Sequence, residues 1–527
     1  MPEAGGGRQL SGRQVSLSKT CMLLAVFLSA LNQTVVATML PSIVADFGGF
    51  DRYVWVVTSY LIASTVAFPI AGRLSDIYGR KPLFIFGIIV FSVGSVLAGL
   101  SQSMAQITAF RAIQGLGGGV MMTCSYTAIA DLFPPQERGK QQGQIAAVYA
   151  LSSVVGPALG GVFADSASWK WLFLSFGPMG ILLLALTSKS FPHIGADAGK
   201  TQPDYPGMAS LALAVVPLLL ALSSGGVLYE WDAPQVIGML VFGLMMSIVF
   251  VVVEAASKAP ILPLEIYANR VVAAAVAAMF LASFGLYGNI IFLPLFFHEV
   301  TGASATVSGS LLVPLLLGIV GGAILSGQAL SRTGNRYRAG TLLCTGVATL
   351  GMYLISGMSE NTGLVLGGAC IALLGLGLGG AFAVLSVAVQ NSAPFALVGS
   401  ATSALQFSRS VGGMLGLALL GIVMTRSFSS GLEAALSADL MAALPQGGLD
   451  ALRDNPQAFL EPSAALALAS SFAGTGADAV HAADALLSAV KVALAGALND
   501  AFTVITVVMA LGFGVALFLR APDEVAD

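Results

Sequence analysis

The chain contains a succession of apolar runs, each about 20 residues long, and this feature limits its fold more than any other. A helix that crosses the hydrocarbon core of a bilayer needs about 20 mostly apolar residues. Fourteen such runs can be counted, at residues 20–41, 54–74, 82–100, 106–130, 141–163, 170–188, 207–224, 235–255, 271–295, 305–328, 338–357, 363–388, 398–424 and 497–519. The sequence therefore predicts an all-α polytopic membrane protein with fourteen transmembrane helices.

The composition excludes most soluble classes of protein. Charged residues make up only 9% of the chain and hydrophobic residues 56%, whereas soluble domains carry about 25% charged residues. The sequence has no P-loop, no HExxH motif, no zinc-type Cys/His spacing and no basic stripe. We therefore predict that the protein is not an enzyme, that it binds no cofactor, metal or nucleic acid, and that the lipid bilayer surrounds it.

The distribution of Lys and Arg predicts how the chain lies in the membrane. With a cytoplasmic N-terminus, twelve of these residues fall in inner loops between spans and five in outer loops, which is the bias expected of cytoplasmic segments. All four tryptophans fall near the outer ends of predicted helices, where aromatic rings anchor helices at the interface. We expect a multi-pass protein of the cell inner (plasma) membrane with two cytoplasmic tails, 1–19 and 521–527.

An internal repeat is visible in three pairs of glycine-rich segments, which are separated by offsets of 255, 260 and 256 residues. The pairs are Gly72–Arg80 with Gly327–Arg336, Gly115–Gly119 with Gly375–Gly380, and Gly156–Gly161 with Gly412–Gly416. Three matches at nearly one offset indicate two parallel halves, which is a known transporter architecture. We predict six-helix bundles at 20–190 and 270–520, with two inserted transmembrane helices at 204–256.

The second half contains a long Ala-rich segment, 427–495, which this topology places outside the cell. Residues 484–494 within it have the apolar periodicity of a helix. Two interpretations remain open. One is a partly helical cap or an extended start of the last span, and the other is a disordered surface loop.

Several segments resemble motifs of the major facilitator superfamily. Residues 72–82 (GRLSDIYGRKP) are similar to the family's segment between helices 2 and 3, while residues 111–119 and 156–161 are similar to its fourth-helix motif and its fifth-helix antiporter motif. Residues 31–41 resemble the first-helix motif of the fourteen-helix drug:proton antiporter subfamily. The resemblance implies multidrug efflux by proton antiport, and with it antibiotic resistance, through rocking of two six-helix bundles.

The motif between spans 2 and 3 contains Gly72, Asp76, Gly79, Arg80 and Lys81. An acid beside a helix N-terminus is stabilised by the helix dipole. In the family this cluster bridges to a later helix and stabilises one state of the transport cycle, so the resemblance implies a conformational latch. The alternative is a plain cytoplasmic charge anchor.

Two arginines lie inside predicted spans, where a buried charge is costly enough to indicate function. Arg111 lies near the start of span 4, with Gln114 one turn along on the same face. The resemblance implies that Arg111 takes part in proton coupling, and Arg409 in span 13 is a second candidate. The alternative for Arg111 is that its side chain extends to the outer headgroups.

The resemblance is incomplete at Asn32, because the subfamily usually carries a proton-accepting Asp at this position. Asn has no titratable group. Either coupling has moved to another residue, or the protein is not a proton antiporter of the usual kind. Asp165 and Asp500, near outer ends of spans, are candidate protonation sites.

The resemblance also places a substrate cavity between spans 1, 2, 4 and 5 and spans 9, 10, 12 and 13. Aromatic surfaces with few polar groups suit bulky amphipathic ligands, although each phenylalanine is equally compatible with facing lipid. The scarcity of acids argues against dicationic substrates. The predicted substrate-binding residues are Asn32, Gln33, Gln114, Tyr287, Asn289, Phe292 and Gln406. The glycines and proline of the fifth-helix motif predict a bend and close helix packing; they are Gly156, Pro157, Gly160 and Gly161.

Three functional hypotheses follow. The favoured one is a monomeric secondary transporter that exports small hydrophobic or amphipathic compounds in exchange for protons. An exporter of lipids or lipid-like molecules is the alternative that the long outer segment and Asn32 favour. A membrane sensor or scaffold that transports nothing is the third, and intact switching motifs argue against it.

Overall fold

The computed structural model describes residues 3–4, 8–9, 11–47, 53–166, 168–192, 202–226, 228–333, 336–359, 362–436, 441, 470 and 477–519. Among these residues fourteen helices have 20 residues or more. They are α1 (Gly12–Phe47), α2 (Tyr53–Tyr78), α3 (Arg80–Gly99), α4 (Met104–Leu132), α5 (Pro135–Ser166), α6 (Trp169–Ser190), α7 (Tyr205–Ser224), α8 (Pro234–Ala256), α10 (Arg270–Glu299), α12 (Leu312–Arg332), α13 (Tyr337–Ser356), α14 (Leu364–Ser392), α15 (Val398–Ala435) and α19 (Ala477–Ala516).

The remaining described elements are short. They are α9 (Glu265–Ala268), α11 (Ala305–Ser310), the 3-10 helix η2 (Phe395–Leu397), and the strands β1 (Glu3–Ala4) and β2 (Arg8–Gln9), which pair antiparallel. Thirteen helices of the described chain are long and apolar enough to cross a membrane. The glycine-rich α4 is not among them, but its 29 residues extend about 44 Å. The prediction of an all-α membrane protein is confirmed.

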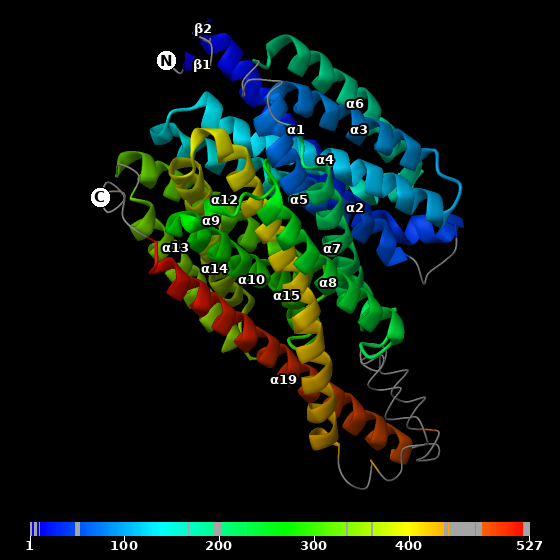
Figure 1. The fold of residues 1–527 in the computed structure, drawn as a ribbon. Coiled ribbons are helices and arrows are strands. Elements are labelled where there is room, and N and C mark those ends of the chain that lie inside the picture. Colours follow the sequence, from blue (N-terminus) through cyan, green and yellow to red (C-terminus); the bar gives the residue numbers. More distant parts are fainter. Residues whose placement is uncertain are drawn as a thin grey trace.

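The long helices form two bundles, which lie side by side in Figure 1. Helices α1 to α6 pack together around one hydrophobic core, and α10 to α19 pack around two others. The inserted pair α7 and α8 packs on itself and, through α7, against α2 and α15. The bundles contact each other mainly through α5 with α12 and α2 with α15. The predicted fold of two six-helix bundles with two inserted helices is confirmed.

Equivalent glycines pack in equivalent ways in the two bundles. A methyl group on Gly115 of α4 would overlap the backbone of α2, and one on Gly375 of α14 would overlap the backbone of α12. Gly117 and Gly377 make the matching approaches to α3 and α13. The offset of 260 residues therefore relates the same close helix contacts in both bundles, which only glycine permits.

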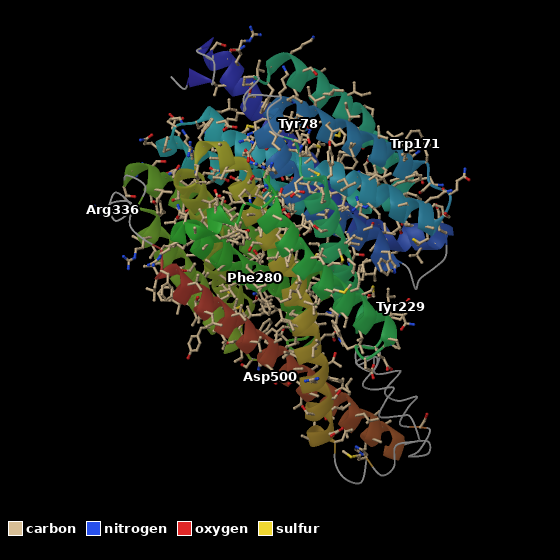
Figure 2. All side chains as sticks on the ribbon, viewed as in Figure 1. Tyr78, Trp171, Tyr229, Phe280, Arg336 and Asp500 are labelled. Carbon is tan, nitrogen blue, oxygen red and sulfur yellow. The ribbon has the colours of Figure 1, made fainter. Side chains whose placement is uncertain are left out.

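The outside of the bundles is apolar. Ile181, Ile248, Leu343 and Val365 are each more than two-thirds exposed, and Trp171 is an exposed side chain at the margin of the first bundle (Figure 2). A soluble monomer rarely exposes such extensive apolar surface. Lipid chains are the environment that suits this surface.

Helices α15 and α19 project beyond the other helices at one end (Figure 1). They contain 38 and 40 residues, or about 57 and 60 Å, against about 30 Å for the hydrocarbon core. The last span, expected at 497–519, belongs to a helix that begins twenty residues earlier, because its Ala-rich first part is periodic but less hydrophobic. Residues 427–435 and 477–495 are thus helical, and most of the segment between them lies outside the described residues.

Candidate functional site

A cavity of about 550 Å³ lies between the two bundles. Its lining comes from α1, α2, α4 and α5 of the first bundle and from α10, α12, α14 and α15 of the second. These correspond to spans 1, 2, 4 and 5 and spans 9, 10, 12 and 13. The volume falls within the range of about 300–1,000 Å³ that is typical of small-molecule sites.

Most side chains that line the cavity are aliphatic or aromatic, and four of them are tyrosines. The described polar residues of the lining are amides and hydroxyls, among them Gln33, Gln142, Gln406, Thr38 and Ser153. Arg111 and Arg409 are the charged residues of the described lining, which includes no Asp, Glu or His. The cavity is therefore an apolar chamber that carries two positive charges.

Arg111, on α4, is completely buried. Its Nε donates a 3.1 Å hydrogen bond to the carbonyl oxygen of Val56, and its Nη1 donates to Gln114 Oε1 at 2.7 Å and to Asn32 Oδ1. The guanidinium lies 4.4 Å from the centre of the Tyr60 ring. The side chain thus points into the first bundle, which argues against its extending to the membrane surface.

The cluster around Arg111 has an excess of donors. Arg111 Nη2, Asn32 Nδ2 and Gln114 Nε2 are all buried and have no hydrogen-bond partner. Each of these atoms is an N–H donor. A group that completes this cluster must therefore be a hydrogen-bond acceptor.

Arg409, on α15, lies among aromatic rings. Its guanidinium carbon is 5.2 Å from the ring centre of Tyr149 and 5.7 Å from that of Phe382. Tyr126, Tyr149 and Tyr287 all lie near its charge. Cation–π contacts of this kind stabilise a cation without neutralising it.

The two arginines are connected through α1 and α5. The Tyr149 hydroxyl, beside Arg409, donates a 3.0 Å hydrogen bond to Gln33 Oε1, and the preceding residue, Asn32, accepts from Arg111. The cavity thus brings together residues from both bundles, from α5 and α1 on one side to α15 on the other.

The predicted substrate-binding residues separate into two groups. Gln33, Tyr287 and Gln406 line the cavity. Asn32 and Gln114 lie behind it as partners of Arg111. Asn289 donates to the carbonyl of Gly285 at 2.7 Å and Phe292 is buried in the core of the second bundle, so neither lines the cavity.

Of the two predicted protonation sites, the structure describes the side chain of Asp500 alone. Asp500 is exposed on α19, where Ser427 Oγ of α15 donates to its Oδ2, toward the projecting end (Figure 2). The side chain of Asp165 lies outside the described residues. The carboxylate of Asp500 is not among the groups of the described cavity lining.

A second cluster closes one end of the interface between the bundles. Asp76, at the end of α2, accepts hydrogen bonds from Gly399 N at 3.0 Å and from Ser400 N and Oγ at 2.8 and 2.9 Å. Gly399 and Ser400 belong to the first turn of α15, whose N–H groups have no partner within the helix. Asp76 of one bundle therefore caps a helix of the other, where the helix dipole favours a negative charge.

Arg80 holds this cluster together. It donates to Asp76 Oδ1 at 2.7 Å and to Asp131 Oδ2 at 2.8 Å, and the three side chains are at most 3% exposed. Gly79, with φ of 88°, supplies the turn before α3, and a methyl on Gly72 would overlap Ser403 of α15. We call Gly72, Asp76, Gly79, Arg80 and Asp131 the interface cluster.

Two further basic residues, Arg138 and Lys81, differ in whether they contact the other bundle. Arg138, on α5, donates to the Gln390 carbonyl at 3.0 Å and to Asn391 Oδ1 at 2.6 Å, both at the end of α14. Lys81 lies apart, and its Nζ donates to the carbonyl of Ser188 at 2.7 Å. Of the five motif residues predicted to act together, four belong to the cluster and Lys81 does not.

The fifth-helix motif packs α5 tightly on α1. A methyl on Gly156 would overlap Thr34, and one on Gly160 would overlap Thr38. Pro157, inside α5, lines the cavity. No atom lies near the position of a methyl on Gly161, so this glycine has no packing role in the described structure.

Sequence reasoning missed several residues of both sites. Tyr126, Tyr149 and Phe382 surround Arg409, and Ser400 binds Asp76. A tyrosine inside an apolar span is a weak signal for a polar cavity, since its hydroxyl needs a partner. No local signal marks Ser400, because its partner is 324 residues away in the sequence.

Comparison with known proteins identifies the family. Residues 22–417 match the model of the Major Facilitator Superfamily. Multidrug resistance protein 3 of Bacillus subtilis (strain 168) is 38% identical over 416 residues, which cover 79% of this chain and 81% of the relative. Multidrug transporter protein MdtP of the same organism is 36% identical over 407 residues, or 77% and 74% of the two chains.

Solved structures agree on the fold. The human organic anion transporter MFSD10 (TETRAN) superposes with a TM-score of 0.59 at 15% identity, over 95% of this chain and 99% of that one. The proton:xylose symporter XylE superposes with a TM-score of 0.55 at 12% identity, over 97% and 96%. Together with the family match and the two Bacillus relatives, the two-bundle architecture shows that this chain belongs to the major facilitator superfamily, a family of membrane transporters rather than enzymes.

Proposed function

We propose that this protein is a secondary active exporter of small hydrophobic or amphipathic compounds, driven by the proton gradient. The observation that carries the proposal is the largely apolar 550 Å³ cavity, to which eight helices of both bundles contribute. Relatives that are 36–38% identical are multidrug transport proteins by name. A chamber of this kind binds ligands by area and shape rather than by many specific bonds.

Alternating access is the transport mechanism that the two ends of the interface support. The interface cluster and Arg138 join the bundles at one end. On α1 and α2 the lining residues, 33–38 and 57–61, lie nearer the opposite ends of those helices. If the Lys and Arg bias sets the orientation, the joined end is cytoplasmic. The interface cluster then acts as the conformational latch of an outward-facing state.

Proton coupling requires a titratable group whose access alternates with that of the substrate. The described cavity lining contains no carboxylate, and Asn32 presents its oxygen to Arg111. Substitution Asn32→Asp would place a carboxylate against this guanidinium. If the position remains on the coupling pathway, the variant gains dependence on the pH gradient; if the coupling residue lies elsewhere, that dependence is unchanged.

The remaining parts of the proposal concern location and assembly. We place the chain in the plasma membrane of the cell as a monomer with both termini cytoplasmic, so that export removes compounds from the cytoplasm. A drug-sensitive bacterium that expresses the protein should then grow at higher concentrations of amphipathic antibiotics than the same strain without it. Labelling of single cysteines after α2 and after α12 should occur from the same side of the membrane.

Transport in proteoliposomes tests the proposal. Purified full-length protein is reconstituted, and a set of lipophilic dyes of negative, zero and positive charge is added under an imposed pH gradient. At least one dye should move, and its movement should cease when an ionophore removes the gradient. Protein-free liposomes serve as the control. Movement of fluorescent phospholipid with no movement of any dye would replace the proposal by lipid export, and movement of neither would refute both.

A further inference from the structure

We infer that the cavity selects lipophilic anions over cations of the same size and shape. This inference rests on the proposed export function and names the chemical class of its substrate. A ligand of this class has an extended apolar body and one carboxylate or sulfonate group. Four observations on the cavity support it.

The first observation is the sign of the charge. Arg111 and Arg409 are the charged groups of the described lining, and arginine stays protonated under all ordinary conditions. Buried charges within a membrane normally pair with one another or with backbone carbonyls. Among the described residues, Arg80 forms such pairs with Asp76 and Asp131. Neither cavity arginine belongs to them.

The second observation is the surplus of donors beside Arg111. Its own Nη2, together with the amide nitrogens of Asn32 and Gln114, is buried without an acceptor. The oxygens of both amides already accept from Arg111, so the amides hold the guanidinium in place and cannot neutralise it. A ligand that brings an anionic acceptor satisfies the free guanidinium nitrogen and balances the charge.

The third observation is the setting of Arg409. Its guanidinium lies near the rings of Tyr149 and Phe382, on opposite bundles. A guanidinium beside aromatic rings keeps planar N–H groups that match the two oxygens of a carboxylate. The rings also provide surface for an aromatic or aliphatic ligand body. An anion bound here would contact α5 of one bundle and α14 and α15 of the other.

The fourth observation is the rest of the lining. Leu286, Ile290, Leu315 and Ile319 belong to an apolar wall from the second bundle. An inorganic anion would leave this wall without a partner, whereas a lipophilic anion covers it. A lipophilic cation would cover it equally well, but it would meet two like charges at short range in a low dielectric. Charge sign is therefore what separates the two ligands.

Equilibrium binding of a matched pair of probes tests the inference. The probes are 4-(1-pyrenyl)butanoate and 4-(1-pyrenyl)butyl-trimethylammonium, which share the aromatic body and differ in the sign of the charge. Binding to purified full-length protein in detergent is followed by quenching of tryptophan fluorescence and corrected with empty micelles. We expect the dissociation constant of the anion to be at least about tenfold lower than that of the cation.

Variants assign the preference to the arginines. Arg409→Gln should reduce the ratio of the two dissociation constants by about tenfold, and Arg409→Lys, which keeps the charge, should retain most of it. Arg332→Gln removes a charge from the exposed end of α12 and should leave the ratio unchanged. If Arg409→Gln fails to fold, the ratio of the two dissociation constants is compared between Arg111→Gln and the wild type instead.

The outcomes separate this inference from the proposed function. If the cation binds as tightly as the anion, or is transported in proteoliposomes as fast, the inferred selection for anions is wrong while the export function stands. The inference also fails if the anion preference is the same in Arg409→Gln and Arg111→Gln as in the wild type. If proteoliposomes move neither pyrene probe nor any other dye, the export function itself fails.

Discussion

Two buried arginine sites in this protein have opposite electrostatic surroundings. Arg80, in the interface cluster, is 3% exposed and lies within 2.8 Å of two carboxylates. Arg111, at the cavity, is fully buried and has only neutral partners, two amides and a backbone carbonyl. Desolvating either guanidinium costs free energy, but only in the interface cluster do carboxylates of the same chain offset that cost.

The difference separates a charge that stabilises a conformation from a charge that is available to a ligand. Removing one partner of a buried, paired cluster leaves an uncompensated charge and costs about 3–5 kcal/mol. Removing a buried charge that has no counter-ion relieves a desolvation cost instead. Stability measurements on matched variants can therefore tell the two kinds of site apart, independently of any transport assay.

Among the carboxylates, the largest effect is expected at Asp131. Substitution Asp131→Asn keeps an oxygen that can accept a hydrogen bond from Arg80 but removes the negative charge of that side chain. Arg80 then has Asp76 as its single carboxylate partner. We expect the free energy of unfolding to fall by about 3 kcal/mol. Unfolding in mixed micelles of a mild detergent and dodecyl sulfate measures this change.

The matched control is Asp46→Asn near the C-terminal end of α1. Asp46 accepts a 2.9 Å hydrogen bond from Trp169 Nε1 and is itself exposed. Because water already solvates this carboxylate, we expect the free energy of unfolding to fall by less than about 1 kcal/mol. Equal losses in Asp46→Asn and Asp131→Asn would mean that the ion pair of Arg80 contributes nothing special to stability.

A smaller effect is expected at Asp76, and it concerns the equilibrium between conformations. Asp76→Asn weakens the charge-assisted bonds to Gly399 and Ser400, which exist only while the bundles are joined at this end. If these bonds lose about 2 kcal/mol of interaction free energy, the ratio of joined to open states falls by about 30-fold. The rate at which a maleimide alkylates Ser403→Cys should rise by a similar factor, since Ser403 is fully buried in the joined state.

This measurement needs a background in which the four native cysteines are replaced, namely Cys21, Cys124, Cys344 and Cys370. Asp46→Asn, which lies away from the interface cluster, should leave the alkylation rate of Ser403→Cys unchanged. A rate that Asp76→Asn does not alter would show that the interface cluster is a charge anchor and not a conformational latch.

The sequence predicts these sites unevenly. Apolar runs and the repeat of Gly115 at Gly375 are local or periodic signals. They are sufficient to predict the helices, the two bundles and the close contacts of α4 with its neighbours. The contact of Asp76 with α15 is not local. The two segments are separated by 323 residues, and a pattern in either one does not specify how the bundles meet.

Helix rotation explains why only some of the predicted substrate-binding residues line the cavity. Tyr287 lines it, whereas Asn289 faces α13, where its Nδ2 donates to Met352 at 3.2 Å. Two residues along an α-helix correspond to a rotation of about 200°, so these side chains point in nearly opposite directions. Polar character alone predicts the same role for both. The direction of each face becomes fixed only when the neighbouring helices pack.

The smallest stability effect is expected at Arg111, and it separates the two arginine sites most sharply. Arg111→Met replaces the guanidinium with a shorter, unbranched apolar chain, and Asn32 and Gln114 can then bond to each other or to nearby carbonyls. Because no carboxylate loses its partner, we expect the free energy of unfolding to stay within about 1 kcal/mol of the wild type, or to rise. Arg80→Met leaves Asp76 and Asp131 buried together and should cost at least about 3 kcal/mol. If both methionine variants lost the same stability, Arg111 would be a structural residue like Arg80. A stable Arg111→Met protein that no longer prefers the pyrene anion would instead assign the unpaired charge to the ligand.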